Sequence, residues 1–161
     1  MTKIRAVIIT VSDASAAGHR EDLSGAELVE LLNELGATII AKEIVNDDLD
    51  PLADKLRTYA DQPDVNLIIT TGGTGFGPRD NTPEATLRVI DRAAPGLAEA
   101  MRGETLKHTP MAMVSRGVSG IRSDALIVNL PGSPKAVRES FAVIKPVLGH
   151  AIDLLAGQTR H

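Results

Sequence analysis

Two short runs of apolar, largely β-branched residues constrain the fold of this chain more than any other feature. Residues 4–11 and 67–71 are mostly apolar at successive positions and do not alternate with polar residues. Strands of this kind are buried on both faces, which is typical of the interior of a parallel sheet. Because parallel neighbours must be joined by long crossover connections, we expect helices between the strands.

Helical patterns do occupy the intervening segments. Leucines recur at helical spacing through residues 28–35, with Asp22 or Ser24 as the candidate N-cap and Gly36 as the stop signal. Further strands are predicted at 38–45, 111–114 and 125–130, and further helices at 52–59, from Thr82-Pro83, from Pro95-Gly96 and through 137–155, where Pro146 is expected to kink or divide the helix. The pattern predicts one α/β domain over residues 1–161, with a mostly parallel sheet covered by helices on both faces.

The charge and composition of the chain exclude several classes of protein. Seventeen Lys and Arg against 21 Asp and Glu give a net charge of −4, which disfavours nucleic acid as a partner. Aromatic residues make up only 2%, too few for a base-stacking surface, and the absence of cysteine excludes disulfides and thiolate chemistry. A phosphate ligand would have to be held by main-chain amides, helix N-termini, a few cations or a metal.

Membrane insertion is not expected. No apolar run approaches the roughly 20 residues that span a bilayer. Residues 1–5 lead directly into an apolar strand and lack the layout of a signal peptide. The expected location is the cytoplasm.

Four polar or glycine-rich segments follow predicted strands, and they are the candidates for a ligand site. They are residues 12–13, 46–48, 72–80 and 131–133. In an open α/β sheet, ligands bind beyond the carboxyl ends of the strands. We therefore expect these segments to meet at one edge of the sheet.

The glycine-rich segment 72–80 is the strongest of the four. Four of its residues 72–77 are glycine, which permits positive φ angles and a close approach of main-chain amides to an anion. A helix begins near Pro83, and Arg79 supplies a cation. The segment lacks the lysine of a Walker A loop and has Pro78 where a dinucleotide fingerprint needs glycine. The alternative is a turn that serves only the fold.

Acidic residues follow two of the strands. If Asp47 and Asp80 converge beside phosphate, their mutual repulsion would favour a divalent cation such as Mg²⁺, which takes one or two carboxylates together with phosphate oxygens. The alternative for Asp47 is a turn or cap residue, and for Asp48 this alternative is preferred.

Three further pairs of residues are candidates for ligand contacts. Ser12 and Asp13 suit the edge of a polar heterocycle, as carboxylates suit amino-bearing bases, unless they only form a turn. The other pairs suit phosphate and have a surface cation or a helix cap as the alternative; they are Ser115 with Arg116, and Ser133 with Lys135.

Residues 70–86, Thr-Thr-Gly-Gly-Thr-Gly-Phe-Gly-Pro-Arg-Asp-Asn-Thr-Pro-Glu-Ala-Thr, closely resemble the signature of the MoaB/Mog family of molybdenum-cofactor biosynthesis proteins. Similar blocks extend over nearly the whole chain: 11–13 with Asp22 and 24–25, 94–96 with 101–102, 115–116 with 120–122, 129–135 and 150–155. Mog enzymes and the gephyrin G domain are the relatives that the sequence most resembles.

The resemblance implies a three-layer α/β/α sandwich, usually a homotrimer. It implies molybdopterin as substrate, a pterin whose dithiolene side chain ends in phosphate. Mog enzymes transfer AMP from Mg-ATP to that phosphate, and the product passes to a molybdate-insertion (MoeA-like) protein. A non-catalytic molybdopterin-binding protein and a self-associating scaffold like gephyrin are the alternatives. Both family acids are present, which favours the enzyme.

The resemblance also assigns roles to individual residues. Asp47 and Asp80 match the catalytic, Mg²⁺-binding acids, although Asn46 stands where relatives often have proline. The implied nucleotide and phosphate residues are Gly72, Gly73, Thr74, Gly75 and Arg79. The implied residues for the pterin or its phosphate are Ser12, Asp13, Ser115, Pro131, Gly132, Ser133 and Lys135.

Overall fold

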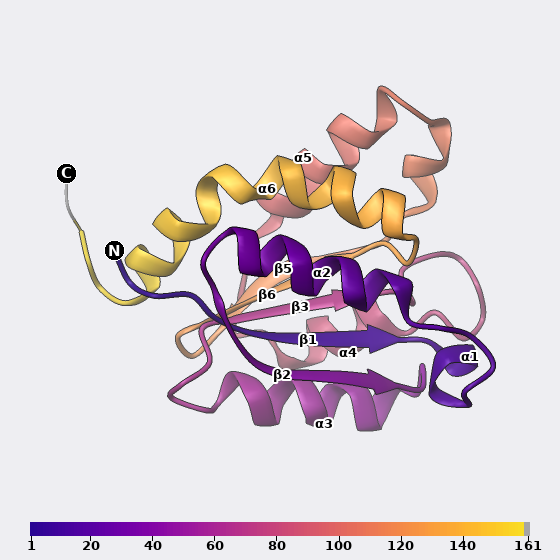
Figure 1. Cartoon of the computed structure of the whole chain (residues 1–161), viewed down its shortest axis with the longest axis horizontal. Helices are drawn as coiled ribbons and strands as arrows, with labels where there is room; N and C mark the ends of the chain where they lie inside the picture. The colour runs from indigo at the N-terminus through magenta and orange to yellow at the C-terminus, as the bar shows by residue number, and fades with distance from the viewer. Residues whose placement is uncertain (160–161) are drawn as a thin grey trace.

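Six strands form one mixed sheet at the centre of the molecule in the computed structural model, which describes residues 1–159 (Figure 1). The strand order is β2-β1-β3-β6-β5-β4. Four strands run parallel: β2 (Thr38–Val45), β1 (Arg5–Val11), β3 (Leu67–Thr71) and β6 (Ala125–Leu130). At one edge, β5 (Ser119–Arg122) and β4 (Arg92–Ala93) continue the sheet in antiparallel pairing. The predicted mostly parallel sheet is confirmed.

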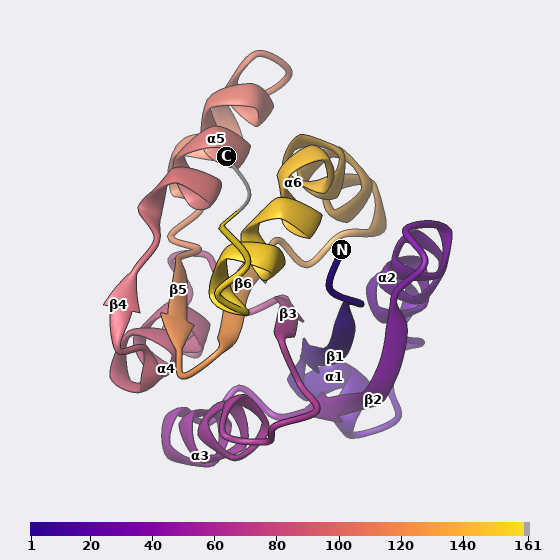
Figure 2. The same cartoon turned by 90° about the vertical axis from the view of Figure 1, so that its left-hand side faces the viewer.

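Helices cover both faces of this sheet (Figures 1 and 2). One face packs against α2 (Leu23–Glu34), α5 (Pro95–Leu106) and α6 (Pro134–Leu155), and the other against α3 (Leu49–Ala60) and α4 (Thr82–Val89). A short helix α1 (Asp13–Ala16) follows β1, and a 3-10 helix η1 (Pro110–Val114) follows α5. The architecture is the expected three-layer α/β/α sandwich. No helix within residues 1–159 is long and apolar enough to cross a bilayer.

Alternate residues of the central strands form two aliphatic cores. In β1, Ala6 and Ile8 face the core under α2 and α6, whereas Val7 and Ile9 face the core over α3 and α4. All four side chains are fully buried. Burial on both faces explains why the strand lacks polar alternation.

Asn129 near the end of β6 fixes the position of three neighbouring elements. Its side-chain amide donates hydrogen bonds of 3.0 Å to the hydroxyls of Thr70 in β3 and Thr86 in α4. Its carbonyl oxygen accepts from the main-chain N–H of Val118 at 3.2 Å. All of these groups lie immediately behind the carboxyl edge of the sheet, so the network holds the strand ends that carry the site.

The prediction of a strand at 111–114 is wrong. Pro110 occupies the first turn of η1, and the hydroxyl of Thr109 caps it by accepting from the N–H of Met111 at 3.2 Å. Met111 and Met113 are exposed, so their apolar character does not reflect burial in a sheet. The antiparallel strands β4 and β5 were not predicted, because their residues carry no long apolar run.

Smaller differences concern helix boundaries. Residues 13–16, expected as loop, form α1 with Ser12 as N-cap. Asn81 is the N-cap of α4, where Thr82 was expected in that role. Of the two candidates for α2, Asp22 and Ser24, it is Asp22 that caps the helix. Pro146 does not divide α6, because it lies on the exposed side of the helix, where a carbonyl left without its helical partner can be hydrated.

Candidate functional site

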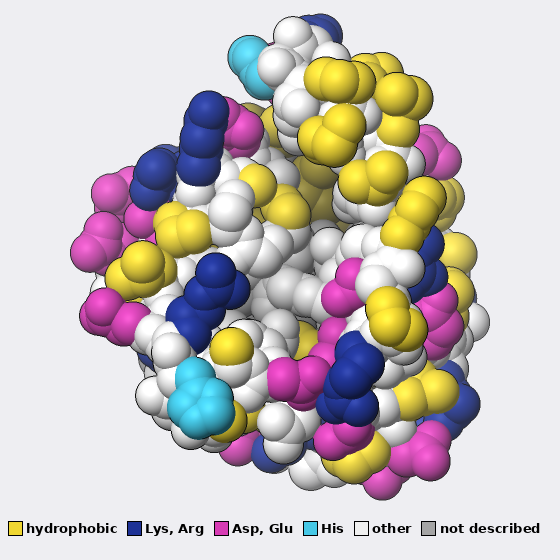
Figure 3. All heavy atoms as spheres, turned by 90° about the vertical axis from the view of Figure 1, so that its right-hand side faces the viewer, with side chains coloured by type: hydrophobic (Ala, Val, Ile, Leu, Met, Phe, Trp, Pro, Cys, Tyr) yellow, Lys and Arg dark blue, Asp and Glu magenta, His cyan; other side chains and the backbone are white. Residues whose placement is uncertain are grey.

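An open cavity of about 540 Å³ lies at the carboxyl edge of the parallel strands. Figure 3 shows the molecular face that is hollowed there, with acidic and basic side chains around the hollow. We call it the polar cavity; its lining comes from the loops after β1, β2, β3 and β6 and from the start of α2: Thr10, Val11, Ser12, Asp13, Ser15, Arg20, Glu21, Asp22, Leu23, Ser24, Asp47, Thr71, Gly72, Gly73, Arg79, Asp80, Gly132, Ser133 and Pro134. The four segments expected to meet do so.

The segment from Gly72 to Asp80, here called the glycine loop, presents free main-chain donors. Gly72 and Gly73 adopt positive φ angles of 94° and 66°. Their carbonyls accept hydrogen bonds from the hydroxyl and the N–H of Thr82, at 3.0 and 3.1 Å. Within residues 1–159, the N–H groups of Gly73, Thr74 and Gly75 have no acceptor. Unpartnered amides in a glycine-rich turn are suited to an anion.

Helix N-termini add further positive potential to the polar cavity. Asp22, Leu23 and Ser24 at the start of α2 and Ser133 at the start of the 22-residue α6 line it. Ser12 and Ser133 each accept from a main-chain N–H three residues on, both at 3.1 Å, so both are helix caps. Their position in the cavity wall still aims the ends of α1 and α6 at a ligand.

Asp47 is a buried carboxylate in the wall of the polar cavity, with 5% of the residue exposed. Burial raises the pKa of Asp47 to about 6, and repulsion from Asp80 and Asp13 adds to the rise. A 3.0 Å hydrogen bond from the N–H of Asn81 opposes it. Asp80 and Asp13 line the same cavity as Asp47.

Asp80 shares the cavity but is bonded to its own loop. Its carboxylate accepts from the N–H of Gly77 at 2.9 Å. Among residues 1–159, no cluster of three or more His, Cys, Asp or Glu side chains is arranged to hold a metal. A divalent cation held by Asp47 and Asp80 would take its other ligands from water or substrate oxygens.

Arg79 is engaged by carboxylates rather than left for phosphate. Its guanidinium donates to Asp13 at 2.7 and 3.0 Å and to Asp48 at 2.9 Å. The hydrogen bond from Arg79 lowers the pKa of Asp13, and one from the N–H of Asp47 assists. These ion pairs therefore link the segments that follow β1, β2 and β3.

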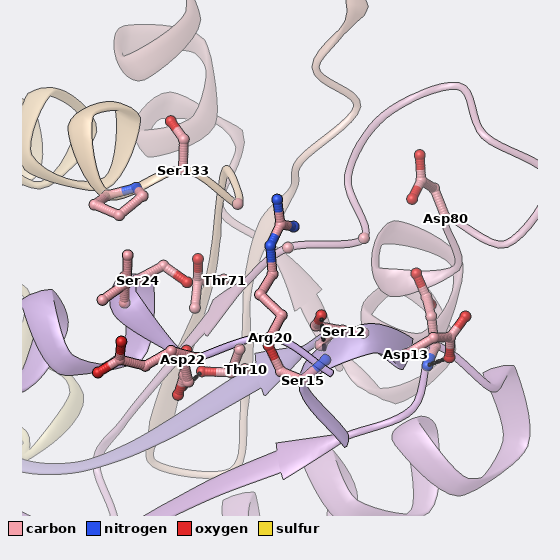
Figure 4. Close-up of a pocket in the computed structure, with 18 of the residues that line it drawn as sticks. Thr10, Ser12, Asp13, Ser15, Arg20, Asp22, Ser24, Thr71, Asp80 and Ser133 are labelled. Carbon is pink, nitrogen blue, oxygen red and sulfur yellow. Dashed lines mark hydrogen bonds between the residues drawn. The ribbon is translucent and has the colours of Figure 1, made fainter. Parts of the chain in front are cut away.

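Arg20 is a cavity residue that the sequence did not reveal. It follows α1, lines the polar cavity and is exposed, and within residues 1–159 no ion pair or hydrogen bond engages its guanidinium. Figure 4 shows its side chain extending into the cavity lined by Ser12, Ser133 and Asp80. A single arginine in a loop carries no pattern that could have singled it out.

Several expected residues lie outside the polar cavity. Ser115 and Pro131 line a second, largely apolar cavity of about 200 Å³ between α5, η1 and α6, here called the apolar cavity. Lys135 is 81% exposed in its side chain, with Glu139 4.0 Å away. Thr74 is buried, and Thr74 and Gly75 do not line the polar cavity as the loop stands.

The electrostatic balance of the polar cavity is acidic. Its lining contains five carboxylates and two arginines, one of which is the ion-paired Arg79. Amides and helix ends supply the remaining positive potential. Such a site can accept a phosphate group only together with a cation or by main-chain hydrogen bonding.

Fold and cavity together define an α/β protein with helices on both faces of its sheet and a polar cavity at the carboxyl edge, where ligands bind in open α/β sheets. Residues 7–150 match the family described as "Probable molybdopterin binding domain", and the chain belongs to that family.

Relatives are similar over most of the chain. A molybdopterin adenylyltransferase of Helicobacter pylori is 40% identical over 159 residues, 98% of this chain and 90% of that protein. That of Escherichia coli K12 is 36% identical over 154 residues, covering 94% of this chain and 79% of the other. The crystal structure of the molybdopterin biosynthesis enzyme MoaB from Thermus thermophilus superposes with a TM-score of 0.90 at 47% identity, covering 96% and 97% of the two chains.

Gly73→Ala tests how closely the glycine loop is packed. A Cβ at this position would lie 2.5 Å from the Asp47 carboxylate, and φ is positive. We expect a loss of about 1–3 kcal/mol in unfolding free energy, measured by urea denaturation. The matched control is Gly103→Ala in α5, where a Cβ meets nothing within 4 Å; it should gain about 0.5–1 kcal/mol. Equal effects of the two substitutions would contradict the packing described.

Asp47→Asn tests the buried charge. The folded-state pKa of about 6 exceeds the ordinary 3.8, so protonation of Asp47 stabilises the fold below about pH 4 and this contribution is lost as pH rises through 6. Asparagine keeps an acceptor for Asn81 without the charge. The ligand-free variant should be more stable than wild type at pH 7, by up to about 3 kcal/mol, and equal to it near pH 4. Parallel stability curves from pH 4 to 7 would refute the assignment.

Proposed function

We propose that this chain is a molybdopterin adenylyltransferase. In the reaction, a terminal phosphate oxygen of molybdopterin attacks the α-phosphorus of ATP. A P–O bond forms to AMP, and the bond to the β-phosphate breaks, which releases pyrophosphate. The observation that carries the proposal is the placement of Asp47 and Asp80 in one cavity with the glycine loop and the ends of α2 and α6. The names of the similar adenylyltransferases support it.

The acidic balance of the cavity supports Mg²⁺ as the metal. ATP and molybdopterin are both anions, and the cavity has more carboxylates than arginines. Asp47 and Asp80 are the proposed ligands. Mg²⁺ held there would neutralise negative charge on the phosphate groups during the transfer. Repulsion from Asp80 and Asp13 contributes to the raised pKa of Asp47, and a bound cation would offset that repulsion.

In the wall of the polar cavity, we assign phosphate oxygens to the free N–H group of Gly73, to the start of α6 and to Arg20. The free N–H groups of Thr74 and Gly75, next along the loop, are proposed as further donors. The attacking phosphate oxygen is already ionised at pH 7, so no general base is required. Catalysis then rests on alignment of the two substrates and on neutralisation of charge.

The pterin ring is assigned to the apolar cavity. Ser115 supplies a hydroxyl there, and Met101 and Pro131 supply apolar contacts. Pro131 precedes Gly132 and Ser133 of the polar cavity, so a ligand could extend from one cavity into the other along this loop. A pterin with a phosphorylated side chain has that combination of an apolar-faced ring and an anionic end.

Assembly and context rest on the family resemblance alone. We propose a homotrimer, a cytoplasmic location and a single domain over residues 1–161, with hand-over of the adenylylated product to a MoeA-like molybdate-insertion protein. Nucleic acid is not proposed as a partner, given the net charge of −4.

Pyrophosphate release tests the activity. Purified protein with molybdopterin, ATP and Mg²⁺ should release pyrophosphate, and omission of molybdopterin or Mg²⁺ should abolish the release. Asp80→Ala should lower kcat by at least about 100-fold while molybdopterin affinity changes less than about threefold. Asp80→Asn should be equally inactive, although it keeps an acceptor for the N–H of Gly77. If Asp80→Asn is active, the carboxylate of Asp80 is not needed for catalysis, and the residue serves only to accept the N–H of Gly77.

The same assay separates catalysis from binding alone. Wild-type protein that binds molybdopterin but releases no pyrophosphate would be the non-catalytic binding protein. Arg20→Gln should raise the KM of a phosphate-bearing substrate by about 10-fold with kcat retained, since the side chain has no other partner among the described residues. An unchanged KM would remove Arg20 from the site.

A further inference from the structure

Arg116 is a half-buried arginine that lies behind the glycine loop, and it lines neither cavity. Its main-chain N–H donates to the carbonyl of Thr74 at 2.8 Å. Its guanidinium donates to the carbonyls of Gly75 and Asp80, both at 2.7 Å, and pairs with the carboxylate of Glu84 in the first turn of α4. One residue thus satisfies three carbonyls along the loop.

The two halves of the glycine loop have different supports. Gly72 and Gly73 are held by the sheet and by Thr82. Residues 74–80 are held from the inner side by Arg116, and from the outer side by the exposed ion pairs of Arg79. Hydrogen bonds from a guanidinium are stronger than those from a neutral donor, whereas exposed ion pairs are screened by solvent. Arg116 therefore restrains the part of the loop that carries Asp80, together with the ion pairs of Arg79 and the hydrogen bonds between Gly77 and Asp80.

The neighbours of Arg116 connect it to the second cavity. Ser115 and Gly117, on either side, line the apolar cavity. The side-chain oxygen of Asn129 accepts a hydrogen bond from the main-chain N–H of Val118, and this bond anchors the same segment to β6. The segment 115–118 therefore connects the apolar cavity, the proposed site of the pterin ring, with Asp80, a proposed Mg²⁺ ligand.

We propose that Arg116 is a positioning residue for AMP transfer: it acts through Asp80 and the amides of Thr74 and Gly75, and it sets their position relative to a ligand in the apolar cavity. This rests on the proposed function. The guanidinium contacts loop carbonyls rather than substrate, so its loss should affect the alignment of the reacting groups more than the affinity for molybdopterin.

The test compares Arg116→Gln and Arg116→Lys with Arg122→Gln. Arg122 is a matched control, because its guanidinium also donates to a carbonyl, that of Val89, and to the carboxylate of Asp61, but lies outside both cavities. Arg116→Gln should lower kcat about 100-fold with the KM for molybdopterin changed less than about threefold. Arg116→Lys keeps the positive charge, and its kcat should be about tenfold higher than that of Arg116→Gln. Arg122→Gln should keep wild-type kcat even if it melts at a lower temperature.

Hydrogen exchange in the free protein supplies a readout that needs no turnover. Arg116→Gln should speed exchange of the hydrogen-bonded amides of Gly77 and Asp80, resolved by NMR, by more than about tenfold, and leave residues 67–73 unchanged. Unchanged exchange at Gly77 and Asp80 overturns the proposal whatever the assay shows. The proposal is also overturned if Arg122→Gln lowers kcat as much as Arg116→Gln does when the two variants lose the same thermal stability. A wild-type protein without pyrophosphate release would instead refute the proposed function, and leave the exchange result to decide whether Arg116 holds the loop.

Discussion

Unpartnered main-chain amides beside an acidic cavity are the feature on which the rest of this site depends. The N–H groups of Gly73, Thr74 and Gly75 have no acceptor in the described chain, while five carboxylates line the cavity beside them. Amides attract an anion without adding a net charge, so they can act in a chain whose net charge is −4. A basic surface would bind polyanions indiscriminately, whereas fixed amides select a phosphate group by position.

The parallel sheet makes this arrangement possible. Its central strands end at one edge, which brings together loops that are distant in the sequence, such as Ser12, Asp47 and Ser133. Helices α2 and α6 begin at the same edge, and their first residues line the cavity. The buried network around Asn129 joins the end of β6 to the end of β3, from which the glycine loop begins, and to α4.

Apolar runs in the sequence predicted the parallel strands and the meeting of the loops that follow them. The bounds of β2 and β3 match the apolar runs at 38–45 and 67–71, and the convergence of the four strand-end loops follows from parallel topology. The prediction failed where proline chemistry overrode an apolar run, as in η1, and where antiparallel strands were too short to show a pattern, as in β4 and β5.

The partners of charged side chains were not predictable from the sequence. Arg79 was expected to meet phosphate, yet it is paired with Asp13 and Asp48 from two other loops. Arg116 was weighed as a phosphate ligand or a surface residue, and instead it holds the carbonyls of a segment about 40 residues earlier in the chain. Such contacts depend on tertiary geometry, which no spacing in a single sequence encodes.

Amide NMR of the glycine loop tests the central claim most directly. Mg²⁺ and a non-hydrolysable ATP analogue would be titrated into ¹⁵N-labelled protein, followed by molybdopterin. The account predicts that the largest downfield proton shifts fall on Gly73, Thr74 and Gly75, as expected for amides that gain a phosphate acceptor. Unmoved signals from these three residues, with shifts confined to lysine- and arginine-bearing surface segments, would contradict it.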